Sequence, residues 1–173
     1  NAEKAFWINA YNALVIKTML EFPTISSIRD IPFYKGVFWK KRFIIGGQKL
    51  SLNDIEHGIL RKKFKDPRIH FAINCASISC PPLHNSIYKA KNLDTLLEEK
   101  AFSFINDTNN VKINHKQETI YVSKIFKWFK NDFIHSSKSI QNYIYKYKAS
   151  KDKRILRYRV RFLNYSWESN KKY

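Results

Sequence analysis

Apolar side chains occupy every side of residues 5–20, where the run FWINAYNALVIKTML carries one charge, Lys17. A helix that is apolar all round is typical of a protein interior. Pro23 follows this stretch, and a proline disfavours helical backbone in the residue before it. The pattern therefore predicts a buried helix at residues 5–20.

Strand and turn signals come next along the chain. Residues 39–45 predict a strand, and Gly46-Gly47 predicts a hairpin turn into a short return strand. Ser51 is followed three residues later by Asp54, which is a capping-box pattern. We expect a helix to begin there and to end near residue 63.

A mostly apolar run, IHFAINC, occupies residues 69–75 between Asp66-Pro67 and a loop that contains Pro81-Pro82. Short apolar runs bounded by such turn residues are typical of strands buried on both faces. We predict a strand at residues 69–75 that leads into a rigid loop.

The same periodicities predict helices at residues 92–106, 123–133 and 139–147, a β-hairpin at 111–113 and 119–122, and a last strand at 160–163. The chain has 173 residues, 44% of them apolar, which suffices for one core but not for two ordinary domains. We expect a single α/β domain over residues 1–173, with α+β as its variant, a small central sheet, a buried N-terminal helix and peripheral helices. Because the first residue is Asn1 and the helical pattern starts almost at once, we expect residues to be missing upstream.

The formal charge is +18, from 32 Lys plus Arg against 14 Asp plus Glu. Such a balance favours an anionic partner, but the lysines are scattered and no known nucleic-acid motif is present. A solvated basic surface and weak, non-specific polyanion binding both remain open. No run of eighteen apolar residues occurs, so we expect no transmembrane segment. Two cysteines are too few for a disulfide scaffold, and they do not identify a compartment.

Cys75 is the leading candidate for chemistry. It ends the apolar run at the kind of loop where α/β proteins present functional side chains. A thiolate nucleophile needs a cationic neighbour, and His57 is the first choice, with its ring nitrogen expected within about 4 Å of the sulfur. His84 is the second choice. The alternative is a small, buried, apolar cysteine.

Other polar residues are expected near Cys75. Glu56 falls within the apolar stripe of the capped helix, so we expect a buried carboxylate that serves catalysis or pairs with an arginine. His70 is expected on the strand face opposite Cys75, which argues against it as the base. Asn9 and Asn12 share one side of the first helix. They are expected to pin the Cys75 loop or to donate to an oxyanion. Ser79 of that loop is likewise a candidate for substrate or oxyanion binding.

Four segments carry a further signal: FWINAYNA (6–13), SLNDIEHGILR (51–61), FKDPRIHFAINCASISCPPL (64–83) and SKIFKWF (123–129). Together they resemble the family catalogued as domain of unknown function number 547. The last segment, NYSWESN (164–170), is similar to a family ending with Tyr-Asp-Trp, but Ser166 stands at the Asp position. The resemblance implies an α/β domain found in bacteria, often in exported proteins, and in larger plant and animal proteins. On that ground alone a periplasmic or extracellular location is favoured, and no reaction is implied.

The leading hypothesis is a cysteine-dependent hydrolase or acyl-transferase whose mechanism is like that of a thiol protease or a transglutaminase. In it Cys75 attacks an unknown small or peptide-like substrate, His57 moves the proton, and Glu56 supplies orientation or charge, with no cofactor. A second hypothesis is a non-catalytic binding module for an anionic polymer or a protein, in which Cys75 only packs. A third is a zinc site formed by Cys75, Cys80 and His57, although CxxxxC is a weak metal spacing.

Overall fold

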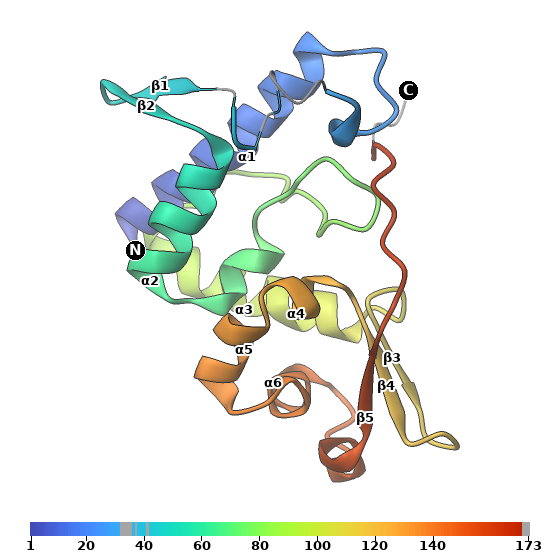
Figure 1. Ribbon diagram of the computed structural model, residues 1–173. Coiled ribbons are helices and arrows are strands. Elements are labelled where there is room, and N and C mark those ends of the chain that lie inside the picture. Colours follow the sequence, from blue (N-terminus) through green and yellow to red (C-terminus); the bar gives the residue numbers. More distant parts are fainter. Residues whose placement is uncertain (32–35, 37, 41, 171–173) are drawn as a thin grey trace.

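Helices and two small sheets make up the computed structural model, which describes residues 1–31, 36, 38–40 and 42–170 (Figure 1). The expected mixture of helix and strand is confirmed. Within the described residues the strands form one two-stranded and one three-stranded sheet, which are not joined into a single central sheet. No described helix has both the length and the apolar character needed to cross a membrane.

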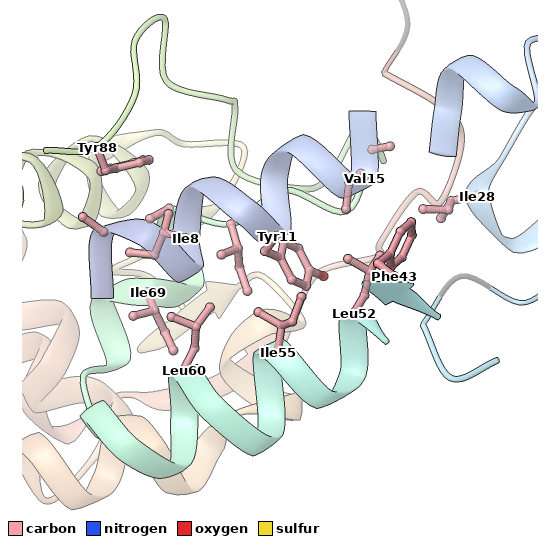
Figure 2. Packing of buried hydrophobic residues seen from close by; sticks show 14 of the residues in the cluster. Ile8, Tyr11, Val15, Ile28, Phe43, Leu52, Ile55, Leu60, Ile69 and Tyr88 are labelled. Carbon is pink, nitrogen blue, oxygen red and sulfur yellow. The ribbon is translucent and has the colours of Figure 1, made fainter. Parts of the chain in front are cut away.

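The N-terminal helix α1 spans Ala2–Glu21 and ends just before Pro23, as predicted. Figure 2 shows Tyr11 and Val15 of this helix pointing toward Ile55 and Leu52 of the capped helix. The opposite side of α1 is exposed at several apolar positions, namely Phe6, Ile16 and Leu20. The helix is therefore buried along one side, not all round.

The predicted hairpin and capped helix are both present. Strands β1 (Phe43–Ile45) and β2 (Gln48–Leu50) pair in antiparallel register around Gly46 and Gly47, whose φ angles of +55° and +79° suit glycine. The first strand is shorter than predicted, because residues 38–40 form a turn, and Lys41 lies outside the described residues.

The capping box also forms as predicted. The Asp54 amide donates to Ser51 Oγ at 3.1 Å, and the Ser51 amide donates to Asp54 Oδ2 at 2.9 Å. The helix that follows is a π-helix over Asp54–Arg61, and it continues into α2 (Lys62–Phe64). π-helical turns are uncommon and occur often at functional sites.

The strand predicted at residues 69–75 is wrong. Pro67–Phe71 forms a 3-10 helix, and the chain beyond Ala72 is a loop. Asp66 caps this helix by accepting from the Arg68 amide at 3.1 Å, and Pro67 occupies the first helical position, which it favours. The run is apolar because it is buried, and a short buried run has the same composition whether it is helical or extended.

Helix α3 (Leu93–Asn106) follows a 3-10 turn at Ala90–Asn92 and connects the two hydrophobic clusters of the protein. Its Leu93 and Leu97 belong to the cluster around α1, whereas Ala101 and Phe104 belong to a second, C-terminal cluster. The predicted helix is confirmed. It holds the two halves of the structure together.

The second cluster is covered by a sheet and three short helices. Strands β3 (Val111–Asn114) and β4 (Thr119–Val122) are antiparallel, and β5 (Arg159–Phe162) joins β4 in parallel. The helices are α4 (Ile125–Trp128), α5 (Lys130–Ser137) and α6 (Ile140–Tyr147), so the helix predicted at residues 123–133 is interrupted at Phe129. Short 3-10 helices at Ile28–Asp30 and Lys153–Arg157 complete the elements described.

After β5 the chain runs back toward the N-terminal half as an extended segment, drawn in red in Figure 1. Residues 164–170 lie beside the loop that follows Cys75. Ser169 forms a β-bridge with Ser77, and the Ile78 amide donates to the carbonyl of Glu168 at 2.8 Å. We call residues 164–170 the C-terminal strap, because they close over the Cys75 loop.

Candidate functional site

The loop that carries Cys75 is held by a network of side-chain and backbone hydrogen bonds. Asn74 Nδ2 donates to the Pro81 carbonyl at 2.7 Å, and the Ala76 amide donates to Asn74 Oδ1 at 2.6 Å. Ala76 has a φ of +62°, in the left-handed region that alanine rarely adopts. Strained backbone of this kind gathers at functional sites, and here it immediately follows the candidate nucleophile.

The two asparagines of α1 have different partners. Asn12 Nδ2 donates to the Ala72 carbonyl, and its Oδ1 accepts from the Asn74 amide, both at 2.9 Å. Asn12 therefore pins the start of the Cys75 loop to α1. Asn9 Nδ2 donates to the Tyr88 carbonyl at 2.8 Å and its Oδ1 accepts from the Tyr88 amide at 2.9 Å, and Asn9 makes no hydrogen bond with the Cys75 loop within the described chain.

Ser79 supports the loop from its other side. Its Oγ accepts from the Ser166 amide at 2.9 Å. This contact connects the loop to the C-terminal strap. In the described chain the Ser79 hydroxyl makes no hydrogen bond with the Cys75 sulfur. Asn9, Asn12 and Ser79 thus act on the surrounding backbone in this structure, and their proposed role toward an oxyanion remains a prediction.

Three side chains surround the sulfur of Cys75. Ser77 Oγ lies 3.1 Å and Tyr165 Oη 3.4 Å from Cys75 Sγ, and these two hydroxyls lie 3.0 Å from each other. The third is Cys80, whose sulfur accepts from the Cys75 amide at 2.9 Å. Both cysteines are free thiols.

This arrangement lowers the pKa of Cys75. The Cys80 thiol makes the largest contribution by hydrogen bonding to the sulfur, and Ser77 and Tyr165 add to it, so that the pKa falls to about 6 despite burial. Burial raises the pKa of Cys80. The two thiols share their protons as a pair, and the charge falls on Cys75 because that sulfur has the hydroxyl donors.

A pocket of about 100 Å³ opens at this sulfur and also contains Cys80, Glu56 and His70. Six aromatic side chains line it: Tyr11, Phe38, Trp128, Phe129, Tyr165 and Trp167. Among the described residues, no lysine or arginine lines it. The candidate nucleophile therefore faces a small, largely apolar space whose further ionisable groups are Cys80, Glu56, His70 and the two tyrosines.

Glu56 is buried, as its place on the apolar stripe predicted, and its exposed fraction is 7%. Tyr11 Oη donates to Glu56 Oε2 at 3.2 Å. Burial raises the pKa of the carboxyl to about 7, against the smaller opposing effect of Tyr11. Within the described chain Glu56 has no ion pair with an arginine. The alternative interpretation, a structural Glu56–arginine pair, is therefore not observed.

His57 points to a different neighbour than expected. Its Nδ1 lies 2.6 Å from Arg61 Nη1 and accepts from it, and no hydrogen bond joins His57 to Cys75 in the described chain. Burial and the Arg61 charge lower the pKa of His57. The predicted contact is absent because adjacent helical residues point in different directions, so Glu56 faces the pocket and His57 does not line it.

His70 lines the pocket instead. Its Nε2 lies 2.8 Å from Asp132 Oδ2, its ring stacks on Phe129, and its Nδ1 is buried without a hydrogen-bond partner. The argument that His70 and Cys75 face opposite ways assumed a strand, and it fails because residues 67–71 are a 3-10 helix. His84 lines a separate cavity of about 370 Å³.

Asp132 orients both His70 and Arg61. It accepts two hydrogen bonds from the Arg61 guanidinium, at 2.7 and 2.9 Å, in addition to the one from His70. These bonds hold the pKa of Asp132 well below its usual range although burial opposes them. Because the carboxylate can only accept, His70 Nε2 carries its proton and Nδ1 is left as the basic nitrogen.

The zinc hypothesis finds no matching geometry in the described residues, where no group of three His, Cys, Asp or Glu side chains could hold a metal ion. Cys75 and Cys80 hydrogen-bond to each other, whereas His57 bonds to Arg61.

A family model described as protein of unknown function, DUF547, matches residues 1–105. The chain belongs to this family. The matched part of the DUF547 chain contains Glu56, His70 and both cysteines, whereas Asp132 and Tyr165 lie beyond it. Neither the curated proteins nor the solved structures include a significant match.

Sequence reasoning missed several residues of the site in this DUF547 protein. Ser77 was overlooked between the two cysteines, and Tyr165 was quoted only as part of a family-like ending. Asp132 gave no signal, since it lies among the lysines and aromatics of residues 123–133. The family-like segment NYSWESN marked residues 164–170 as a conspicuous motif, but the sequence did not indicate that these residues contact the Cys75 loop.

Proposed function

We propose that this protein is a cysteine-dependent hydrolase or acyl-transferase with Cys75 as its nucleophile. One observation carries the proposal: the Ser77 and Tyr165 hydroxyls and the Cys80 thiol surround the Cys75 sulfur at a pocket that also contains Glu56 and His70. A buried thiol that only packs has no need of such polar neighbours, whereas a thiolate needs hydrogen-bond donors to remain charged.

The first step is attack of the Cys75 thiolate on the carbonyl carbon of the substrate. A carbon–sulfur bond forms, and the carbonyl electrons move to oxygen to give a tetrahedral oxyanion. The Ser77 and Tyr165 hydroxyls lie 3.1 and 3.4 Å from the sulfur, and we assign the oxyanion to Tyr165 because it is the one of the two that lines the pocket. The Cys75 and Ala76 amides are already donating to Cys80 and Asn74.

Collapse of the oxyanion expels an alcohol or amine, which must receive a proton. Glu56 suits this step, because burial raises its pKa to about 7 and a protonated carboxyl is then available near neutral pH. The thioester is next attacked by water or by an acceptor nucleophile. The carbon–sulfur bond breaks, and the thiolate returns.

The attacking water or acceptor must lose a proton, and His70 is the base that we assign to it. Loss of this proton from His70 to solvent and uptake of one by Glu56 then return both groups to their starting states. His70 Nδ1 is unpartnered, and burial lowers the pKa of the ring, so this nitrogen is free of a proton at neutral pH. Asp132 fixes the tautomer from the other ring nitrogen at 2.8 Å. This assignment moves the proton-transfer role from His57 to His70.

Alkylation by iodoacetamide, in which sulfur displaces iodide, tests the nucleophile directly. Labelling of the reduced, folded protein is followed from pH 5 to 9, and peptide mass mapping separates Cys75 from Cys80. The expected result is rapid labelling of Cys75 with a midpoint near pH 6, well below the value of about 8.5 for a free cysteine. Cys75→Ser is the control that should abolish it.

Labelling of Cys75 only after denaturant is added would overturn the proposal. The protein would then be better described as a binding module, with its charge of +18 available to an anionic polymer or protein. Hydrolysis of activated esters, assayed on the wild type and on Cys75→Ser, provides the second readout, since a catalytic thiol predicts that only the wild type turns over.

A further inference from the structure

The geometry points to a short, uncharged, apolar acyl group as the part of the substrate that enters the Cys75 pocket. This inference rests on the proposed function and names the substrate class for it. The side chains that line the pocket are mainly aromatic and aliphatic, and the groups able to ionise are Glu56, His70, the tyrosines and the two cysteines.

The first argument concerns anions. The chain holds 32 lysines and arginines, yet none lines the pocket within the described residues. Among the described residues that line the pocket, His70 is the one group that becomes a cation when it ionises, and burial lowers its pKa; the thiols, the tyrosines and Glu56 become negative. A substrate carboxylate or phosphate would lose its water and find no lysine or arginine lining the pocket in exchange, which is strongly unfavourable. Anionic acyl groups are therefore excluded.

The second argument concerns cations, which aromatic walls can attract. Here two of the rings already hold protein cations: the Arg29 guanidinium lies 5.3 Å from the centre of Trp167, and that of Arg61 lies 5.0 Å from the centre of Phe129. A second cation on these rings would be repelled by the first. The overall charge of +18 adds to this repulsion.

The third argument concerns the wall itself. Trp128, Tyr165 and Trp167 contact one another, with ring centres 4.7 to 5.5 Å apart, so they form one continuous aromatic surface. Tyr165 belongs both to this surface and to the donors on the sulfur. An acyl group packed on the surface would thus lie beside the attacking atom.

The size of the pocket limits the acyl group. Its volume of about 100 Å³ is smaller than the roughly 150 Å³ cavity that holds a benzene ring. A branched chain of about three to four carbons, which is smaller than a benzene ring, is accordingly the largest group that enters without rearrangement. The rest of the substrate would remain outside, on the surface of the protein.

Matched chloromethyl ketones, R–CO–CH2Cl, test this specificity. The Cys75 sulfur bonds to the methylene carbon, and chloride leaves. R is isobutyl, 2-carboxyethyl or 3-ammoniopropyl, which differ by at most one non-hydrogen atom, and each rate is divided by the rate with glutathione and by the iodoacetamide rate of the same protein. We expect the isobutyl probe to label Cys75 roughly tenfold or more faster than either charged probe.

Variants of the aromatic wall connect this preference to the pocket. Trp128 has an exposed fraction of 43%, so Trp128→Ala should fold, and it should reduce the apolar preference several-fold. Trp128→Lys places a cation in the wall and should shift the preference toward the 2-carboxyethyl probe. Phe102→Ala is the matched control, because Phe102 is an exposed aromatic residue outside the pocket and its loss should change nothing.

The possible outcomes separate the two proposals. If Cys75 resists iodoacetamide as well as all three ketones, the proposed function itself fails. If Cys75 reacts with iodoacetamide but reacts with the three ketones at equal normalised rates, the proposal that Cys75 is a nucleophile is retained and the proposal of an apolar acyl pocket is refuted. A preference for the 3-ammoniopropyl probe would show that the aromatic wall binds cations and would likewise refute this inference.

Discussion

The buried carboxyl of Glu56 makes the stability of this protein depend on pH in a direction that can be measured. Burial raises the pKa of Glu56 from its ordinary 4.5 to about 7, so the folded protein retains a proton that the unfolded chain releases. Between these two pH values the folded state binds more protons than the unfolded state. Stability from this group therefore falls as the pH rises from about 4.5 to about 7, and it changes little above that.

The magnitude follows from the pKa values themselves. Each pKa unit corresponds to about 1.36 kcal/mol, so a rise from 4.5 to about 7 removes about 3 kcal/mol of unfolding free energy across the window. Glu56→Gln keeps the shape of the side chain and an oxygen that accepts from Tyr11, but it has no proton to lose. The variant should thus resemble the wild type near pH 4.5 and exceed its stability by up to about 3 kcal/mol at pH 8.

Urea unfolding, followed by tryptophan fluorescence at pH 4.5, 5.5, 6.5, 7.5 and 8, gives the difference between the two proteins at each pH. Glu99→Gln is the matched control, because it makes the same chemical change at an exposed position. A Glu56→Gln difference that stays constant from pH 4.5 to 8 would refute the reasoning, since it would mean that burial does not perturb this carboxyl.

Three further predictions concern the sulfur and the surface. Cys80→Ala removes the largest cause of the low Cys75 pKa, so the midpoint of iodoacetamide labelling should move from about 6 toward 8.5, and an unchanged midpoint would contradict the assigned role of Cys80. Tyr165→Phe should slow hydrolysis of an activated ester by on the order of a hundredfold if its hydroxyl stabilises the oxyanion, with near wild-type turnover as the opposing result. Binding to heparin should be weak and should vanish by about 0.3 M salt, as expected for scattered charge; tight, sequence-selective nucleic-acid binding at that salt would show instead a specific site.

Local signals account for the parts of the fold that could be predicted. The Gly46-Gly47 hairpin and the Ser51 capping box depend on residues next to one another in the sequence, and both form as expected. Helix α3 is long enough for its apolar periodicity to be clear. The burial of Glu56 was also predicted from helical periodicity, and in the π-helix Glu56 is buried together with Ile55 and Leu60.

The site itself was less predictable, because its contacts connect distant parts of the chain. Tyr165 meets the Cys75 sulfur across 90 positions, and no local pattern encodes such a contact. The choice of His57 over His70 depended on the predicted strand at residues 69–75. Once that segment is a 3-10 helix, side chains no longer alternate between two faces, and the reason for setting His70 aside disappears.

The C-terminal strap has a consequence for the newly made protein. Ser77 and Cys80 are synthesised within five residues of Cys75, but the Tyr165 hydroxyl and the aromatic surface that continues to Trp167 emerge from the ribosome about ninety residues later. Until then the thiol lacks one of its donors, and the pocket lacks a wall. The nascent chain therefore carries an incomplete site while those ninety residues are added, and the fully activated sulfur appears only in a molecule whose described helices and strands have already been made.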